Sequence, residues 1–214
     1  MSIILNSQSA NVVFNLIRTI QENKEYLSEV DGAIGDGDHG VNMSKGFTIC
    51  KTRLEGLEKL ELTTSLNTLG KILLMEIGGS MGPLYGTFFI EMSKACRDKE
   101  EIDKNIFGEM IEASLKGLQT LSKAEIGDKT IMDTLVPAII AYKESLAQGK
   151  GFAECLQAMK EAAEKGKEST KDMVAKIGRA SRLGERSRGA LDAGATSCNL
   201  ILKSISDSIL LIIS

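Results

Sequence analysis

The chain has 214 residues, 43% of them hydrophobic, and its 26 lysines and arginines are set against 29 aspartates and glutamates. The formal net charge of −3 at pH 7 gives no general reason to expect nucleic acid or a membrane surface as a partner. Length and composition favour one globular domain covering residues 1–214.

The four cysteines are widely separated and include no C-x-x-C pair. This spacing predicts free thiols in a reducing compartment and argues against a zinc site or a disulfide framework. The N-terminus has no basic region followed by an apolar run and a cleavage site, so export is not expected. We therefore expect a cytoplasmic protein.

Apolar residues recur at three- and four-residue spacing along nearly the whole chain, which is typical of amphipathic helices. Alternating strand patterns are rare, and Pro83 and Pro137 each suit the first turn of a helix. The sequence thus predicts an all-α domain. Its expected helices cover approximately 8–28, 41–55, 62–77, 82–98, 104–122, 131–147, 151–176 and 191–212.

The connection after the first helix contains "GDGDHG" at 35–40, which matches the G-x-G-x-x-G pattern of dinucleotide-binding loops. The residues before Gly35 do not form an apolar strand, and no alternation of strands and helices follows, so that interpretation fails. A phosphate would also meet the carboxylates of Asp36 and Asp38. The loop can therefore hold a phosphate only if a cation lies between the carboxylates and the phosphate.

Asp31, Asp36 and Asp38 fall within one short glycine-rich stretch that we expect to be extended, so that Asp36 and Asp38 point the same way. Carboxylates held close together repel unless protons or a cation neutralise them. Hard oxygen ligands suit Mg²⁺ or Ca²⁺. The pattern predicts a metal site that also holds phosphate; a solvated turn that caps the next helix is the alternative.

His39 is the only histidine in the chain. Beside these carboxylates it is interpreted as a residue that orients a ligand, with a covalent phosphoryl carrier as the alternative.

Farther along, the glycine-rich stretch 78–82 leads into a helix that begins near Pro83. Free N–H groups at such a helix start favour an anion, and a close contact between two helices is the other interpretation.

Two later connections also carry unusual sequence. "GDKTIMDTL" places Lys129 ahead of an apolar helix, as part of a helix cap or of the wall of a nucleotide pocket. The arginine segment, residues 178–189, is interpreted as a clamp on phosphoryl oxygens, with a solvated loop as the alternative. Its arginines are Arg179, Arg182, Arg186 and Arg188. The apolar C-terminal stretch 200–213 is too short to span a bilayer.

Together, "IGDGDHGVNMSKGF", "GGSMGPLYGTFF", "GDKTIMD" and "GRASRLGERSRGALDAGATS" resemble, in order and spacing, the ADP-binding subunits of bacterial dihydroxyacetone kinases, the DhaL family. The resemblance covers almost the whole chain. It implies eight antiparallel helices in a barrel with the nucleotide at one end. It also implies ADP, which becomes ATP when phosphorylated, and two Mg²⁺ ions as cofactors.

By the same resemblance, Asp31, Asp36 and Asp38 are the metal ligands, and Arg179 is a catalytic residue that also contacts phosphate. The residues that it places around the nucleotide are His39, Gly40, Val41, Asn42, Ser80, Met81, Ser122, Ile131, Arg179, Asp192, Ala193 and Gly194.

This sequence departs from the family pattern at three of those positions. Met81 replaces a small residue, often serine, so that only its backbone N–H can contact phosphate. Ala193 stands where proline is usual, which loosens the turn before the last helix. Ser122 stands where glycine is frequent.

The resemblance implies two partners, a subunit that binds dihydroxyacetone and a phosphohistidine protein that donates phosphoryl groups from the sugar phosphotransferase system. A homodimer is left open, and neither nucleic acid nor membrane is expected. One alternative is a kinase subunit that exchanges ATP and serves another small ketose. Another is a regulatory module that senses nucleotide and docks a transcription factor.

Overall fold

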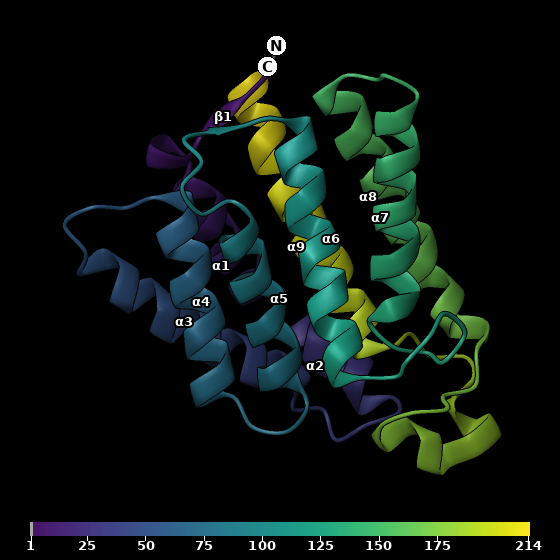
Figure 1. The fold of residues 1–214 in the computed structure, drawn as a ribbon. Coiled ribbons are helices and arrows are strands. Elements are labelled where there is room, and N and C mark those ends of the chain that lie inside the picture. The colour runs from purple at the N-terminus through teal and green to yellow at the C-terminus, as the bar shows by residue number, and fades with distance from the viewer. Residues whose placement is uncertain (1) are drawn as a thin grey trace.

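The computed structural model describes residues 2–214, and over that range the chain is almost entirely helical (Figure 1). The predicted all-α class is confirmed. The α-helices are α1 Asn11–Glu22, α2 Lys24–Gly32, α3 His39–Glu55, α4 Leu62–Glu76, α5 Met81–Ala95, α6 Lys104–Leu121, α7 Met132–Ala147, α8 Phe152–Ser169 and α9 Ala193–Ile213. The short 3₁₀ helices are η1 Asn6–Gln8, η2 Thr170–Asp172 and η3 Arg179–Ser187.

One short antiparallel pairing joins the first residues to the middle of the chain. Strand β1, Ile4–Leu5, pairs with β2, Glu101–Ile102, so that Ile4 lies opposite Ile102. Both of these isoleucines are buried. The pairing therefore fastens the N-terminus to the segment between α5 and α6.

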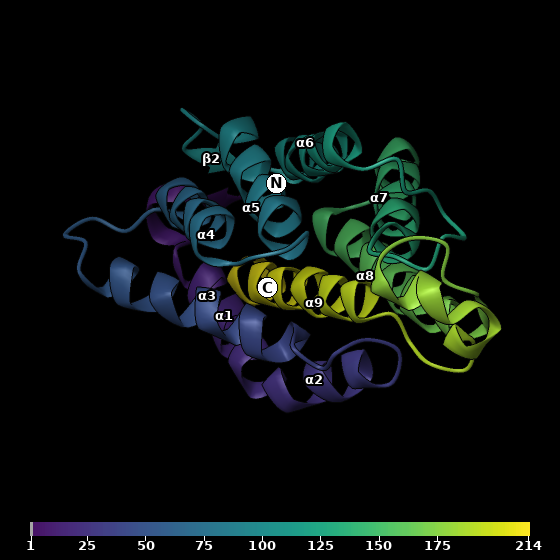
Figure 2. The same ribbon diagram turned by 90° about the horizontal axis from the view of Figure 1, so that it is seen from below.

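The helices from α3 to α9 pack in chain order, each against the next, and α1 packs against both α9 and α3. Viewed from below, α9 lies in the middle of the assembly (Figure 2). The two termini share one end of the molecule, and the connections α2–α3, α4–α5 and α6–α7 lie at the other (Figure 1). The barrel itself stays a prediction.

The core consists of the apolar helix faces that the periodicity predicts. On α9, Ile201, Leu202 and Ile205 are buried, and on α1, Leu16 and Ile17 are buried. Removing such a side chain from water stabilises the fold by about 1.5–3 kcal/mol. Packing against a central helix thus supplies the main stabilisation.

Helix α9 is longer than the apolar stretch recognised in the sequence. Its composition and its 21 residues would suit a membrane span, but 61% of its most apolar window is buried inside the fold. It packs against α1, α7 and α8. It is therefore a core helix of the fold.

The predicted first helix, 8–28, is in fact two helices. Asn23 separates α1 from α2 with φ −100° and ψ 12°. Its side-chain Nδ2 donates to Thr19 O at 2.8 Å. A side chain that bonds the preceding turn competes with the helical backbone. The break turns α2 so that its last residues reach the start of α3.

Pro137 is not in the first turn of its helix, as the sequence suggested, but inside α7. Proline cannot donate to the carbonyl four residues earlier, which here belongs to Asp133. That carbonyl faces Gly166 of α8, where a methyl group would lie 2.3 Å from Asp133 O. A residue without a side chain lets α8 approach α7 at this point.

Helices α4 and α5 meet through a pair of glycines, Gly70 and Gly86. A methyl group at Gly70 would lie 2.7 Å from Gly86 O and 2.8 Å from Ile90 N. We predict that Gly70→Ala destabilises the protein by about 1–3 kcal/mol through overpacking. Thermal denaturation should show a midpoint lowered by about 2–12 °C, at roughly 2–4 °C per kcal/mol.

Gly56→Ala is the matched control, because a methyl group there comes no closer than 3.7 Å to its neighbours. Its midpoint should stay close to that of the wild type. Equal midpoints for the two variants would mean that α4 and α5 do not need the glycine contact.

Candidate functional site

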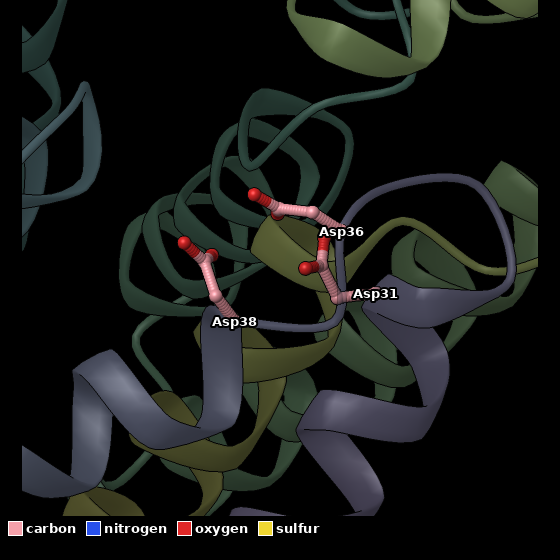
Figure 3. Close-up of side chains that lie close together, drawn as sticks. All are labelled: Asp31, Asp36 and Asp38. Carbon is pink, nitrogen blue, oxygen red and sulfur yellow. The ribbon is translucent and has the colours of Figure 1, made fainter.

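Three carboxylates lie together at the end of the molecule opposite the termini. Asp31 belongs to the last turn of α2, while Asp36 and Asp38 belong to the connection between α2 and α3. Figure 3 shows the three side chains gathered beside this connection. One oxygen from each carboxylate lies within 4.8 Å of the other two. The predicted metal ligands are thus brought together.

The connection is a tight turn and not the extended segment expected. Gly37 has φ +76°, in the left-handed region that glycine adopts without strain, and Asp38 is in the helical region. The N–H of Gly35 donates to Asp31 O at 2.6 Å. The turn and the end of α2 therefore bring the carboxylates together, in place of strand-like alternation.

Arg179, at the start of η3, meets this cluster from a distant part of the chain. Its guanidinium pairs with Asp36 and lies 4.0 Å from Asp38. The side chain of Arg179 is 62% exposed, and those of Asp36 and Asp38 are each 48% exposed. Exposed ion pairs contribute only about 0–1 kcal/mol, so the pairing places a positive charge here without fixing it strongly.

His39 is buried at the first residue of α3, next to the acidic cluster. Its backbone N–H donates to Asp31 at 3.4 Å, and its Nε2 lies 2.8 Å from the hydroxyl of Ser197. That hydroxyl is also 2.5 Å from the hydroxyl of Tyr85. Burial lowers the pKa of His39 to about 4, although the charge of Asp31 opposes this. The imidazole is therefore neutral at pH 7 and bonded to the interior.

The other predicted nucleotide contacts fall mostly at helix starts. Residues 39–42 form the first turn of α3, Ser80 and Met81 begin α5, Ile131 precedes α7, and 192–194 begin α9. N–H groups at such ends are unpaired within the helix and favour anions. Ser122 lies instead at the end of α6, where its hydroxyl accepts from Ala124 N at 3.1 Å. Which of these residues touch nucleotide stays a prediction.

Contacts between elements join several of these helix starts. Tyr85 of α5 donates to Gly194 O at 3.2 Å, which links α5 to the start of α9. A methyl group at Gly194 would lie 3.5 Å from Ile131 N, so α9 also begins beside the start of α7. The starts of α5, α7 and α9 are thus neighbours.

Two charged residues of "GDKTIMDTL", which was interpreted as a helix cap or pocket wall, lie behind these starts together with the predicted nucleotide contact Asp192. Lys129 and Asp133 are each only 1% exposed. Asp133 accepts from Gly127 N at 2.5 Å and Thr130 N at 2.7 Å, and Asp192 accepts from Ala195 N at 2.7 Å. The glycine and lysine of "GDKT", both in the left-handed region, were the available sequence signal.

Asp192 is the most perturbed carboxyl of this group. Burial raises its pKa to about 7; the charge of Asp133 adds to this, while the Ala195 N–H and Lys129 oppose it. Because Asp192 already caps α9, the N–H groups of that helix start are less available to a ligand than those of α3 and α5.

A family model and several known proteins are similar to this chain. The DAK2 domain model matches residues 33–207. The chain is 42% identical to the ADP-binding subunit DhaL of a PEP-dependent dihydroxyacetone kinase from Listeria innocua, over 85% of this chain and 86% of that protein. It is 37% identical to the ADP-binding subunit DhaL of the PEP-dependent dihydroxyacetone kinase from Escherichia coli, over 84% of this chain and 85% of that protein.

Among solved structures, the dihydroxyacetone kinase of C. freundii in its native form superposes with a TM-score of 0.71 at 25% identity. The alignment covers 95% of this chain and 34% of that one. The present chain therefore corresponds to about a third of that larger protein.

We predict that Asp36→Asn and Asp38→Asn each weaken ADP binding in the presence of Mg²⁺ by about tenfold or more, close to 1.4 kcal/mol. Each substitution removes a negative ligand oxygen while keeping the shape of the side chain. Calorimetric titration with ADP and Mg²⁺ measures this, and circular dichroism should show an unchanged helix content.

Asp98→Asn is the matched control, because Asp98 lies outside the cluster and asparagine tolerates its φ of +63°. Its affinity should equal that of the wild type. Unchanged affinity in both loop variants would remove the metal role from the cluster.

Proposed function

The chain belongs to the DAK2 domain family, and we propose that it is the nucleotide-binding subunit of a PEP-dependent dihydroxyacetone kinase. In this role it holds Mg–ADP as a fixed coenzyme. A phosphohistidine protein of the sugar phosphotransferase system supplies the phosphoryl group, and a partner subunit presents dihydroxyacetone to receive it. The reaction takes place in the cytoplasm.

The observation that carries this proposal is the convergence of Asp31, Asp36 and Asp38 within 4.8 Å. Carboxylate oxygens are hard ligands of the kind that Mg²⁺ prefers, and Mg²⁺ is usually shared between a few carboxylates and substrate phosphates. Side chains that are 48% exposed, as for Asp36 and Asp38, leave room for phosphate oxygens on the open side. The donor set therefore fits the cofactor, which we take as two ions.

Bound Mg²⁺ would neutralise the negative charge that phosphoryl transfer spreads over the phosphate oxygens. The residues of this chain are proposed to bind and orient the phosphates. Arg179, whose guanidinium pairs with Asp36, is proposed to contact a phosphate and to serve as the catalytic arginine. In the first turn of α3, Gly40 and Val41 are proposed to offer N–H groups to the phosphate chain, while the N–H of His39 donates to Asp31 and that of Asn42 to Asp38 O at 2.9 Å. Ser80 and Met81 are proposed to do so at the start of α5.

The nucleoside is proposed to lie farther from the aspartates, near Ser122 and Ile131. Residues 192–194, which neighbour Ile131, close that side of the site. Met81 contributes only its backbone at the phosphates. The departures from the family pattern at Met81, Ser122 and Ala193 thus change individual contacts without removing an N–H donor.

His39 serves as a contact residue and not as a phosphoryl carrier. Its ring is buried, its Nε2 is engaged by Ser197, and its pKa of about 4 leaves it uncharged at neutral pH. No nucleophile of this chain is then required, because the β-phosphate of ADP receives the phosphoryl group.

We predict that labelled phosphoenolpyruvate, supplied with the phosphotransferase proteins and the ketone-binding subunit, transfers label to nucleotide held by this chain and then to dihydroxyacetone. The nucleotide should remain bound through gel filtration and be identified as ADP by mass spectrometry. His39→Ala should keep transfer within about tenfold, the scale of one lost contact.

A labelled phosphohistidine on this chain, which has one histidine, would overturn the assignment of His39. An empty site after filtration, with transfer from added ATP, would favour a kinase subunit that exchanges nucleotide. Binding of nucleotide without any transfer would favour a regulatory module.

We also predict that Mg²⁺ and ADP together stabilise the protein. A ligand that binds only the folded state adds roughly 4 kcal/mol at about a thousand times its Kd. At roughly 2–4 °C per kcal/mol, stripping metal and nucleotide should lower the melting midpoint by about 8 °C or more. Neither component alone should restore it fully, since the metal is proposed to be the bridge between the carboxylates and the phosphates. Full recovery with ADP and excess chelator would contradict the bridging role of the metal.

A further inference from the structure

Lys129 is a buried lysine in the connection between α6 and α7. Its side chain is 1% exposed, and its φ of +60° is one that a non-glycine residue rarely adopts. Its Nζ donates to four backbone carbonyls: Thr170 O at 2.7 Å, Met173 O at 3.2 Å, Ser187 O at 2.8 Å and Ala190 O at 2.6 Å. The ammonium is thus surrounded by carbonyl oxygens.

The four carbonyls come from the two stretches of chain that flank η3. One stretch, 170–173, follows α8 and leads toward the arginine segment, and the other, 187–190, ends it. The stretches also bond one another, because Gly189 N donates to Lys171 O at 2.8 Å and Ala175 N to the Ser187 hydroxyl at 2.9 Å. Lys129 therefore joins the stretch that precedes the arginine segment and the stretch that ends it to the start of α7.

The positive charge at this position is needed. Four carbonyl oxygens that point at one place repel one another unless a positively charged donor lies between them, and a lysine ammonium brings three N–H groups and a positive charge. Burial lowers the pKa of Lys129, but the carboxylate of Asp192 opposes this, as does that of Asp133. An apolar side chain of equal length would remove this donor from all four carbonyls and, within residues 2–214, leave only Thr170 O with another bond, from Met173 N at 3.2 Å.

The side chain of Arg179 makes few contacts that would fix its position. It follows Gly178, whose φ is +75°, and its side chain is largely exposed apart from the contact with Asp36. The segment that carries it projects from the ends of α7 and α8 (yellow-green in Figure 1). The position of Arg179 over the acidic cluster therefore depends on the two stretches that Lys129 joins and on the bond from Lys176 N to Asp128 O at 3.2 Å, which the side-chain substitutions below leave in place.

We propose that Lys129 is a positioning residue, whose ammonium joins the stretches before and after the arginine segment and so holds Arg179 over the aspartate cluster. This inference rests on the proposed function, because it takes Arg179 to contact the phosphates of Mg–ADP. Lys129 itself touches neither phosphate nor metal in this account. It acts through Arg179.

A double-mutant cycle on the full chain tests this. Lys129→Met should weaken binding of Mg–ADP by about tenfold in the wild-type background, but by no more than about twofold in the Arg179→Ala background. Lys129→Gln, which keeps an N–H donor, should fall between Lys129→Met and the wild type. An equal loss in both backgrounds would overturn the proposal, because it would show a general structural effect.

Lys176→Met is the matched control, since Lys176 is an exposed lysine near the same segment that pairs with Asp128 at 3.1 Å. Its affinity should stay within about twofold of the wild type. A loss as large as that of Lys129→Met would count against a special role for Lys129.

The rate of trypsin cleavage measures local opening of the arginine segment in the absence of nucleotide. Cleavage after Arg182 or Arg186 should be about tenfold faster in Lys129→Met than in Lys176→Met, because local opening exposes the segment. Equal cleavage rates would overturn the inference even if Mg–ADP does not bind, whereas failure of the wild type to bind Mg–ADP would overturn the proposed function. Failure of both Lys129→Met and Lys129→Gln to fold would show that Lys129 supports the whole fold and would also overturn the inference.

Discussion

Three carboxylates that repel one another are held together at one end of the fold. Charges about 4 Å apart interact with roughly 1 kcal/mol in water, and half-exposed side chains such as Asp36 and Asp38 lie near that limit. Asp31, Asp36 and Asp38 are nevertheless held within 4.8 Å by the end of α2 and the turn at Gly37. Such an arrangement is stable when positive charge is supplied to it. The guanidinium of Arg179 supplies part of that charge, and the proposed metal ions supply the remainder.

The directions of the helices bring several helix N-termini to this end of the molecule. Helices α3, α5, α7 and α9 all begin here, and buried contacts from Tyr85 and Ser197 hold the starts of α3, α5 and α9 together. The partial positive charge of a helix start is worth about 0.3–1 kcal/mol to a nearby anion. Separately, each start is a weak anion site. Beside a cluster of carboxylates and an arginine, they form a surface on which a metal–phosphate complex is complementary to the protein.

Much of the fold followed from the sequence because apolar spacing reports directly on buried helix faces, as on α9. The errors arose where a single side chain overrode that spacing. Asn23 bonds the turn before it and divides the predicted first helix, and Pro137 is accommodated inside α7 because Gly166 faces the carbonyl that it frees. The aspartate cluster was recognisable from the spacing of its aspartates in a glycine-rich stretch, although the turn that forms it was not. The contacts of Lys129 were beyond reach, since its four carbonyl partners lie 41 to 61 residues away in the chain.

In the proposed site a metal ion joins the aspartate cluster to the phosphates of ADP. Electron paramagnetic resonance of Mn²⁺ bound in place of Mg²⁺, with ADP labelled by ¹⁷O at the β-phosphate, measures this contact. A metal that touches both groups should show line broadening from the labelled oxygen in the wild type, and Asp36→Asn should lose the bound-metal signal. Tight binding of ADP and Mn²⁺ without any broadening would contradict the proposed site, because metal and phosphate would then occupy the protein without contact.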